Sequence, residues 1–318
     1  MSHSLFYNSM NMLFLKVSQN IFAVGAALSC CLFSPVTSAW GAMGHEIAGS
    51  LAASYLSENA ESQIKALLGD ESLASAATWA DRMRSHPSEF WQTEAGPYHY
   101  ATVPQGKRYE DVGAPPQGDA FTALRKFGSD LRNPELSLER RQLALRFAIH
   151  IVQDLQQPFH VGNGRDRGGN QISVLINGDR SNLHRVWDRQ IFEARQRDRE
   201  EWKNYFRGSG LLRPVNEIDA APLVWIAESA ALRESLYPPP AIIDAAYIAR
   251  ELPRAEERLA LAGIRTAAWL NNIFDGRTHG LPASEPTEPE NSTPLSPLNP
   301  VQPAQKSWWR RFLDEAFG

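Results

Sequence analysis

The chain has 318 residues, of which 43% are hydrophobic, and a formal net charge of -4 at pH 7. This length and composition allow one large domain or two ordinary ones, and they exclude a fibrous or fully disordered protein. The acidic balance excludes a protein that grips long nucleic acid through a broad basic face, because such proteins neutralise many phosphates with Lys and Arg. A phosphate substrate stays open, since bound metal ions can make a pocket positive on an acidic protein.

The first segment in chain order has the pattern of an export signal. An apolar run, IFAVGAALSCCLF, is preceded by Lys16 and followed by TSA, a small-x-small cleavage pattern. We expect residues 1–39 to be a signal peptide that is cleaved before Trp40. An uncleaved membrane anchor is the alternative, but the run is short for a bilayer.

This expectation carries two consequences. The protein is predicted to be exported, and to be periplasmic or secreted after cleavage. Both cysteines, Cys30 and Cys31, lie within the signal, so the processed chain has no disulfide. Met12 is an alternative start that gives a more compact signal.

From residue 40 to about 275 the hydrophobic pattern is mainly helical. The predicted strand pair covers 171–183, where β-branched and polar residues alternate about an Asn177-Gly178 turn. Residues 87–118 are rich in Pro, Gly and aromatic residues and are expected to form an ordered loop region. The predicted fold class is mainly α, a single helical domain over 40–280 with a small β-hairpin. Predicted helices cover 43–57, 61–68, 71–84, 119–132, 135–157, 184–206, 220–236 and 241–274.

The composition changes after that domain. Residues 281–305 repeat Pro among Ser, Thr, Glu and Asn without apolar periodicity, which predicts a disordered linker. Residues 306–318 contain SWWRRFLDEAFG, the pattern of a short amphipathic helix. This segment either docks weakly on a membrane or a partner protein or packs back on its own domain, because such a short helix is marginal in water.

Two pairs of histidine and aspartate are spaced by about one helical turn. His150 and Asp154 lie in one predicted helix, and His184 and Asp188 repeat the arrangement in another. Each pair projects from one helix face and can reach one metal ion. Taken singly, each pair is more typical of a hydrogen bond on a helix surface. Two such pairs in one chain favour a metal site.

The other histidines strengthen this interpretation. Of the seven histidines after residue 39, five belong to the candidate ligand set, and only His86 and His279 lie outside it. The five are His45, His99, His150, His160 and His184. Imidazole with carboxylate is a donor set that suits zinc, whereas calcium and magnesium prefer oxygen. The sequence therefore predicts a cluster of zinc ions that serves a hydrolytic reaction.

Six motifs occur in order from Trp40 to about residue 275. They are WGAMGHE, ATWADRMR, PYHYATVP, FAIHIVQDLQQPFHVG, RDRGGN and NLHRVWD. In order and spacing they closely resemble the S1/P1 nuclease family of zinc-dependent single-strand nucleases, which is related to zinc phospholipase C. The resemblance implies the helical fold of the phospholipase C/P1 nuclease type. The processed chain lacks the disulfides of fungal and plant members, and we identify it as a bacterial-type member.

The resemblance implies three zinc ions per chain in a helical cleft. The first would be held by Asp81, His99, His150 and Asp154, the second by His160, His184 and Asp188, and the third by the α-amino and carbonyl groups of Trp40 with His45 and the shared Asp154. A free α-amino group, with a pKa of roughly 7.7 to 8, can offer its lone pair near neutrality, whereas a peptide nitrogen cannot. The third ion is therefore expected only after cleavage before Trp40.

The resemblance also implies a reaction. Clustered zinc ions lower the pKa of water towards neutrality and clamp the attacking and leaving oxygens at phosphorus. The expected activity is hydrolysis of single-stranded DNA and RNA to 5′-nucleotides by a zinc-activated hydroxide, with 3′-nucleotidase activity. Asp81, Asp154 and Arg84 are the expected catalytic residues. Arg84 follows Asp81 by one helical turn and can neutralise phosphoryl charge, with a solvated surface arginine as the alternative.

The same resemblance implies the substrate-binding residues Arg84, Tyr100, Asp166 and Asn170. Tyr100 stands where the family places a ring that stacks on a base, an interaction of roughly 1 to 3 kcal/mol that favours single strands; a core tyrosine is the alternative. Asn170 follows Gly168-Gly169, and its alternative is a tight turn before the hairpin. Thr102 replaces an acidic or amide residue of many relatives, which leaves base preference open.

Two other functions stay open. A zinc-dependent phospholipase C uses the same three-metal site, and the WWRRF tail is compatible with membrane contact, but Arg84, Tyr100 and Asn170 favour a nucleotide. A non-catalytic zinc-binding export protein is the alternative outside the enzymes. The expected partners are single-stranded nucleic acid and nucleotides as substrates, and the protein is expected to be a monomer.

Overall fold

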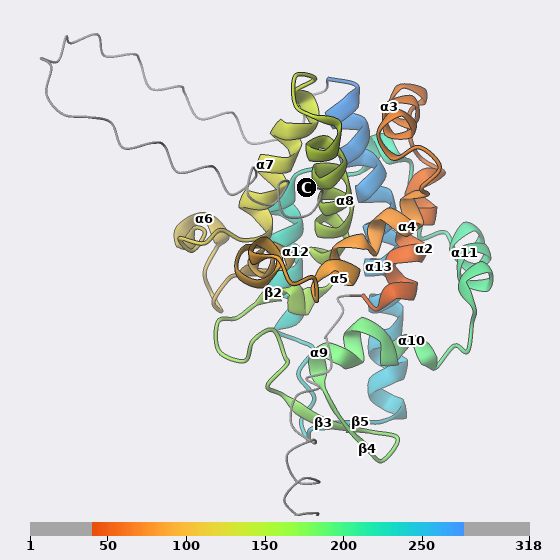
Figure 1. The fold of residues 1–318 in the computed structure, drawn as a ribbon. Helices are drawn as coiled ribbons and strands as arrows, with labels where there is room; N and C mark the ends of the chain where they lie inside the picture. Colours follow the sequence, from red (N-terminus) through yellow and green to blue (C-terminus); the bar gives the residue numbers. More distant parts are fainter. Residues whose placement is uncertain (1–39, 277–318) are drawn as a thin grey trace, which may run out of the picture. The chain divides into compact units, whose positions relative to one another are not determined.

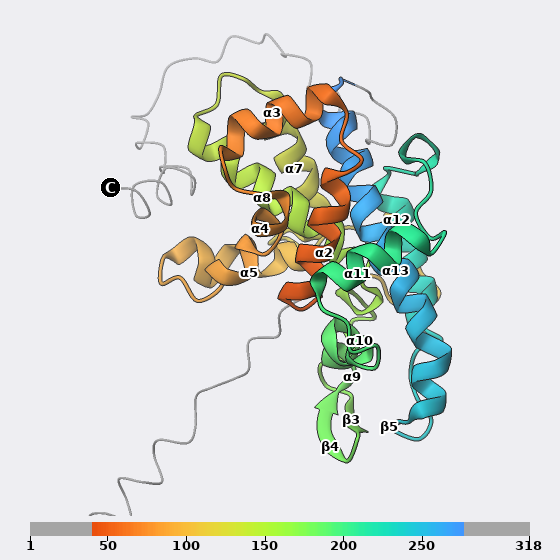
Figure 2. The ribbon, with the colours of Figure 1, turned by 90° about the vertical axis from the view of Figure 1, so that its right-hand side faces the viewer.

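The computed structural model describes residues 40–276, in which helices pack on one another in several directions (Figures 1 and 2). The longest helix, α13 (Ala245–Phe274), runs beside α2 (Ala42–Ala53), and α8 (Leu138–Asp154) contacts both. Gly263 permits the close approach of α13 to α2, because a Cβ at this position would lie 2.7 Å from Cβ of Leu51. The predicted mainly α fold class is confirmed.

The other elements are short. The remaining α-helices are α3 (Glu58–Leu68), α4 (Leu73–Ala77), α5 (Trp79–Met83), α6 (Tyr109–Val112), α7 (Ala120–Arg132), α9 (Leu183–Arg185), α10 (Ile191–Glu193), α11 (Arg199–Gly208) and α12 (Pro222–Arg233). Segments of 3-10 or π geometry are η1 (Phe90–Glu94), η2 (Gly96–His99), η3 (Pro158–His160), η4 (Val186–Gln190) and η5 (Val215–Glu217). The strands are β1 (Ala101–Thr102), β2 (Val161–Gly162), β3 (Ser173–Ile176), β4 (Asp179–Asn182) and β5 (Ile242–Ile243).

The fold buries α8 at its centre. Ser137 caps the start of this helix by accepting a hydrogen bond from the backbone N–H of Arg140. From Phe147 to Asp154 every residue is buried. A helix that is buried on all faces excludes the surface hydrogen bond that the spacing of His150 and Asp154 left open.

The predicted hairpin is confirmed as β3 and β4, which pair antiparallel with Ser173 opposite Asn182. Asn177 and Gly178 have φ values of 52° and 85°, the left-handed geometry of a type I′ turn. Two parallel pairings between distant segments were not predicted, β5 with β3 and β1 with β2. The β1–β2 pair aligns the segments that follow His99 and His160.

The predicted helix over 184–206 is wrong as one element. The chain breaks at 194–198, where Gln196 has a φ of 49°. Asp198 then starts α11 by accepting from the backbone N–H of Glu201, whose carboxylate accepts from the N–H of Asp198. This reciprocal capping box marks a helix start that the periodicity alone does not reveal.

Two further predictions need correction. The predicted helix over 71–84 is divided at Thr78, whose hydroxyl donates to the carbonyl of Ser75 and so competes with regular helix geometry. The region 87–118 is ordered as expected but contains η1, η2 and α6. Phe90 and Trp91 are buried there, so apolar burial rather than regular periodicity shapes this region.

Several predictions lie outside the described residues. These are the signal peptide at 1–39, the end of the predicted domain at 277–280, the linker at 281–305 and the segment at 306–318. Within 40–276, no helix combines the length and the apolar character needed to cross a membrane.

Candidate metal centre

Seven elements bring the predicted ligand side chains together. His45 comes from α2, Asp81 from α5, His99 from the end of η2, His150 and Asp154 from α8, His160 from the end of η3, and His184 and Asp188 from the helical turns of α9 and η4. Seven of these eight side chains are buried, and Asp81 is partly exposed. Such a concentration of buried carboxylate and imidazole is costly unless the groups are paired or bind a cation.

The side chains form three groups, each with ligand atoms within 4.8 Å of one another. The first contains Asp81, His99 and His150, and the second contains His160, His184 and Asp188. The third contains His45 and Asp154, together with His150 of the first group. Within the second group, Nε2 of His184 lies 3.2 Å from Oδ2 of Asp188.

Asp154 lies where these groups meet. Its Oδ1 is 3.3 Å from Nε2 of His45, while its Oδ2 is 3.1 Å from Nε2 of His150 and 3.2 Å from Nδ1 of His99. The second group is also close, since Nδ1 of His160 lies 3.6 Å from the same Oδ2. The two oxygens of one carboxylate therefore face different sets of nitrogens, as a carboxylate shared between two metal ions must.

The atoms that lack partners fit a metal better than a hydrogen-bond network. In the part of the chain that the structure describes, Nε2 of His45, Nε2 of His160 and Oδ1 of Asp154 are buried without a hydrogen-bond partner. Buried polar atoms are normally satisfied, so several orphans in one cluster need an explanation. The nitrogen and carboxylate donors match the ligand preference of zinc.

Backbone carbonyls orient three of the imidazoles. Nδ1 of His150 is 2.7 Å from the carbonyl of Ala77, and Nδ1 of His160 is 2.6 Å from the carbonyl of His99. Nδ1 of His184 is 2.7 Å from the carbonyl of Gly168. A carbonyl only accepts, so each ring donates from Nδ1, and in its neutral form it leaves the Nε2 lone pair for a metal.

Gly168 shows why the glycine pair is needed. Its φ is 59°, and a Cβ there would lie 2.2 Å from the carbonyl oxygen of Phe159. Only glycine fits this position, and its own carbonyl then reaches His184. The backbone of Gly168 thus packs closely against Phe159, the residue before His160.

A buried polar network holds the turn between Asp154 and His160. The hydroxyl of Ser229 donates to the carbonyl of Leu155 at 2.6 Å, and Nε of Arg258 donates to the carbonyl of Gln156 at 2.8 Å. Glu228 accepts from Arg258 and from Arg265. The neighbouring Gln157 donates to Oδ1 of Asp188 at 2.6 Å, which joins this turn to the second group.

The histidines of the cluster differ in pKa because their surroundings differ. Burial alone would raise the pKa of Asp154, but the His150 and His160 imidazoles hold it well below its usual range. Burial also acts to lower the pKa of His150, but the carboxylates of Asp154 and Asp81 raise it to about 9. Burial lowers the pKa of His99 and of His184 to about 4 each. These two rings are therefore neutral and ready to bind metal at pH 7.

Trp40 lies beside this cluster. Its side chain is fully buried, and its indole Nε1 donates to the backbone carbonyl of Gln153 at 2.8 Å. Gln153 was not among the predicted site residues. The available signal was a polar residue next to Asp154 in the stretch AIHIVQD, which is apolar apart from Gln153 and the two predicted ligands.

The part of the chain that carries these side chains matches a known protein family. The S1/P1 nuclease model matches residues 40–275, which include every group described above. The chain belongs to the S1/P1 nuclease family. Its predicted class, a phosphodiesterase hydrolase, is confirmed.

Curated S1/P1 nucleases resemble the chain over most of their length. Nuclease S1 of Aspergillus oryzae is 29% identical over 284 residues, which cover 75% of this chain and 93% of the relative. Nuclease P1 of Penicillium citrinum is 29% identical over 276 residues, or 74% of this chain and 97% of the relative. Endonuclease 3 of Arabidopsis thaliana is 30% identical over 275 residues, or 75% and 90%.

The predicted substrate residues of this S1/P1 nuclease differ in their contacts and exposure. Nη1 of Arg84 is 3.4 Å from Oδ1 of Asp81, which attaches this arginine to a predicted ligand. Tyr100 is 44% exposed, which excludes a core tyrosine. The amide of Asn170 donates to the carbonyl of Arg167 at 3.0 Å and so stabilises the turn before the hairpin.

Asp166 has a structural place in the same loop. Its Oδ1 accepts from the backbone N–H of Gly169 at 3.0 Å, and its Oδ2 accepts from the hydroxyl of Tyr237 at 2.6 Å and from the amide of Asn163 at 3.0 Å. Both oxygens are occupied in holding the loop that carries Gly168. Contact of Asp166 with a substrate stays a prediction.

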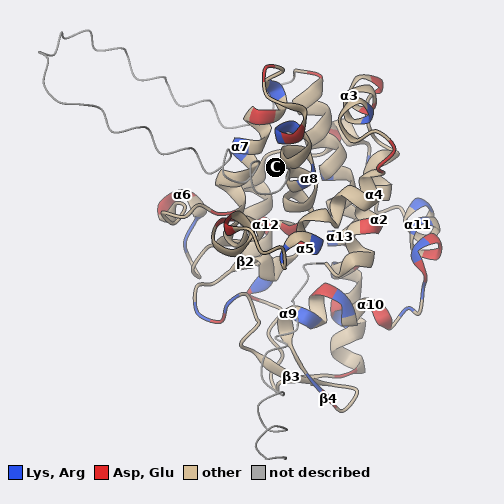
Figure 3. Cartoon of the chain, in the orientation of Figure 1, with Lys and Arg blue, Asp and Glu red and all other residues tan. Residues whose placement is uncertain are grey.

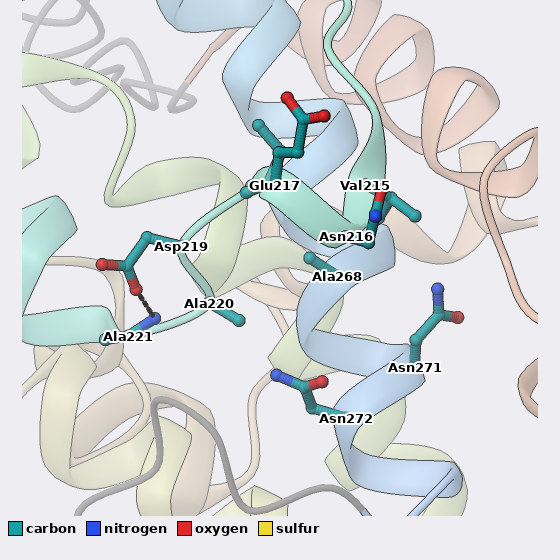
Figure 4. Close-up of a pocket in the computed structure, with 10 residues that line it drawn as sticks. Val215, Asn216, Glu217, Asp219, Ala220, Ala221, Ala268, Asn271 and Asn272 are labelled. Carbon is teal, nitrogen blue, oxygen red and sulfur yellow. Dashed lines mark hydrogen bonds between the residues drawn. The ribbon is translucent and has the colours of Figure 1, made fainter.

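One hollow of the nuclease lies away from these residues. It has a volume of about 630 Å³ and lies between α13 and the segment 215–221 (Figure 4). Asn271 on its wall already pairs with the backbone of Ser57 and Tyr55, and Asp219 accepts from the N–H of Ala221. None of the predicted ligands lines it.

Proposed function

We propose that this chain is an exported, zinc-dependent nuclease that hydrolyses single-stranded DNA and RNA to 5′-nucleotides and removes phosphate from 3′-nucleotides. The observation that carries this proposal is the meeting of three ligand groups at Asp154, in a chain of the S1/P1 nuclease family. The names of the relatives, Nuclease S1, Nuclease P1 and Endonuclease 3, support the same activity.

The proposed cofactor is three zinc ions per chain. Asp81, His99, His150 and Asp154 would hold one ion, His160, His184 and Asp188 a second, and the N-terminal group of Trp40 with His45 and Asp154 a third. Bound zinc would supply an activated water and neutralise charge at phosphorus. The buried, orphaned nitrogens and the Asp154 carboxylate support this assignment.

Arg84 is proposed to act on the substrate phosphate. Its guanidinium is tethered by Asp81 at 3.4 Å and its side chain is 30% exposed, so it can still reach a ligand. A guanidinium offers several donors in one plane and matches the oxygens of a phosphoryl group. In this position it would stabilise negative charge that develops at phosphorus.

Tyr100 is proposed to select single strands. It directly follows His99, and its exposed ring is available for stacking on an unpaired base. Bases in a duplex are already stacked and paired, so they do not offer a face to this ring. In the view of Figure 3, acidic and basic residues alternate along the same elements, such as α11. Together with the formal net charge of -4, this supports recognition within the site rather than along a broad basic face.

The parts of the chain outside 40–276 have proposed roles as well. Residues 1–39 would direct export and be removed, which places the processed protein in a periplasm or outside the cell. Residues 281–305 would link the nuclease domain to residues 306–318, which would dock weakly on a membrane or a protein. The processed protein would act as a monomer.

A substrate panel tests the proposal. Processed protein is incubated with single-stranded DNA, the matching duplex, RNA, 3′-AMP and phosphatidylcholine vesicles, and products are identified by mass spectrometry. We expect 5′-phosphorylated nucleotides from both single-stranded substrates, adenosine from 3′-AMP and little product from the duplex. Release of phosphocholine without nucleotide release would replace the proposal with a phospholipase C, and no hydrolysis of any substrate would leave a non-catalytic zinc protein.

A further inference from the structure

Gln153 makes two contacts that concern the N-terminal side of the metal centre. Its side-chain Oε1 lies 2.7 Å from Nδ1 of His45, and its backbone carbonyl accepts the indole N–H of Trp40 at 2.8 Å. The next residue along α8 is Asp154, whose Oδ1 faces Nε2 of His45. One buried residue therefore touches both groups beside Asp154 that belong to the proposed third zinc site.

The contact with His45 differs from those of three other histidines of the cluster. His150, His160 and His184 each donate from Nδ1 to a backbone carbonyl, which the fold supplies whatever the sequence. His45 has a side-chain amide oxygen in this place. Its ring orientation therefore depends on the identity of residue 153.

The amide nitrogen of Gln153, Nε2, indicates that the contact with His45 is the function of this side chain. Gln153 is fully buried, and among the described residues its Nε2 has no hydrogen-bond partner. Leaving a buried amide nitrogen unsatisfied costs free energy, and an apolar residue would avoid this cost. The contact with His45 is the side-chain hydrogen bond that offsets it.

The direction of that hydrogen bond determines the tautomer of the His45 imidazole. When Oε1 accepts, His45 donates from Nδ1, and the lone pair of Nε2 points towards Asp154. The opposite tautomer would place a proton on Nε2, between the ring and the carboxylate, where a metal is expected. Outer partners of this kind orient a ligand and raise its basicity.

We infer that Gln153 is a positioning residue for the third zinc ion, acting through the ring of His45. The inference rests on the proposed three-zinc site. It deepens that proposal by naming a residue on which one ion depends more than the other two. The first and second groups have no contact of this kind with Gln153 in the described structure.

Three variants of the processed protein test the role. Gln153→Met keeps the length of the side chain and removes the amide, whereas Gln153→Glu keeps an oxygen acceptor at the same distance. Val152→Ala is the matched control, because Val152 is fully buried on the same helix and its side chain has no hydrogen-bonding group. Zinc content and zinc affinity are measured by dialysis against buffered free zinc.

We expect Gln153→Met to bind the third zinc about 10- to 100-fold more weakly and to keep the other two. Gln153→Glu and Val152→Ala should keep all three. Should Gln153→Met fail to fold, Gln153→Asn, which retracts the amide from His45, takes its place with the same expected loss. The inference is overturned if the Met or Asn variant keeps the third ion at unchanged affinity, or if Gln153→Glu loses it equally.

The same measurement separates this inference from the proposed function. Wild-type protein that binds three zinc ions, loses one in Gln153→Met and cleaves no nucleic acid contradicts the nuclease proposal and supports the role of Gln153. Wild-type protein that cleaves single strands, with zinc binding unaffected in Gln153→Met, contradicts the role of Gln153 alone.

Discussion

Oδ1 of Asp154 lies 3.3 Å from Nε2 of His45, although the two residues belong to different helices. The other oxygen of the same carboxylate faces His99 and His150. Asp154 thus connects the N-terminal helix to the remainder of the ligand cluster. This relationship makes Asp154 the residue whose loss affects most of the centre.

Asp154→Asn should abolish hydrolysis with little change in fold. The amide has nearly the same shape but lacks the negative charge that the two ions proposed at Asp154 would require. We expect kcat/KM on single-stranded DNA to fall by at least about 100-fold. Loss of a residue that only hydrogen-bonds to a metal ligand already costs up to about 100-fold in affinity or activity. Asp70→Asn is the control, because Asp70 is exposed and forms its ion pair with the surface Lys65, away from the cluster. Unchanged hydrolysis in Asp154→Asn would support a non-catalytic zinc protein.

Residues placed ahead of Trp40 should remove the third zinc. A peptide nitrogen cannot replace the free amine, whose pKa is about 8, as a ligand. A chain with a cleavable extension before Trp40 is expected to hold about two zinc ions and little activity, and about three ions with full activity after a protease exposes Trp40. The same preparation before and after cleavage provides the control. Equal zinc content and activity in both states would refute the N-terminal ligand.

Gly168→Ala should weaken both folding and the second zinc site. The left-handed backbone costs a side chain about 1 to 2 kcal/mol, and the clash with Phe159 about 1 to 3 kcal/mol more. The carbonyl that orients His184 is displaced at the same time. Gly178→Ala is the matched control, since Gly178 also has a positive φ but no atom within 4 Å of a Cβ. Urea unfolding should show roughly 2 to 5 kcal/mol lost in Gly168→Ala, against about 1 to 2 kcal/mol in the control. Equal losses would contradict the packing argument.

Zinc binding should release protons in the neutral range. The pKa of His150 is raised to about 9, so this ring is protonated at pH 8 in the zinc-free protein and must lose its proton to bind. Affinity for the ion at His150 therefore rises with pH, by about one logarithmic unit per pH unit between about pH 7.5 and 8.5. His99, with a pKa of about 4, contributes no proton there. Calorimetry in buffers of different ionisation enthalpy measures the release; an affinity independent of pH would contradict it.

The sequence predicted which side chains come together better than it predicted the contacts around them. The spacing of His150 and Asp154 placed both on one helix, and the structure brings the other predicted side chains to the same place. These histidines and aspartates can be selected from residue type and spacing along the chain alone. Their use as metal ligands stays a prediction.

The supporting contacts could not be predicted, because they join distant segments. The parallel pairing of β1 with β2 places His99 near His160, and neither two-residue strand has a pattern of its own. The sequence shows Gln153 only as a polar residue in a helix. Its contact with His45 becomes known only from the structure. Asp166 matched a family motif, yet its contacts with Gly169 and Tyr237 depend on a loop that only the fold reveals.

The central claim is that single-strand cleavage requires the complete zinc centre. Its most direct test is a zinc titration of chelated, processed protein, in which the rate of single-stranded DNA cleavage and the zinc content per chain are measured in the same samples. We predict little cleavage until the last of about three ions binds, and full cleavage thereafter. Cleavage by the zinc-free protein at the rate of the loaded protein, or a fully loaded protein that cleaves no single strand, would contradict the claim.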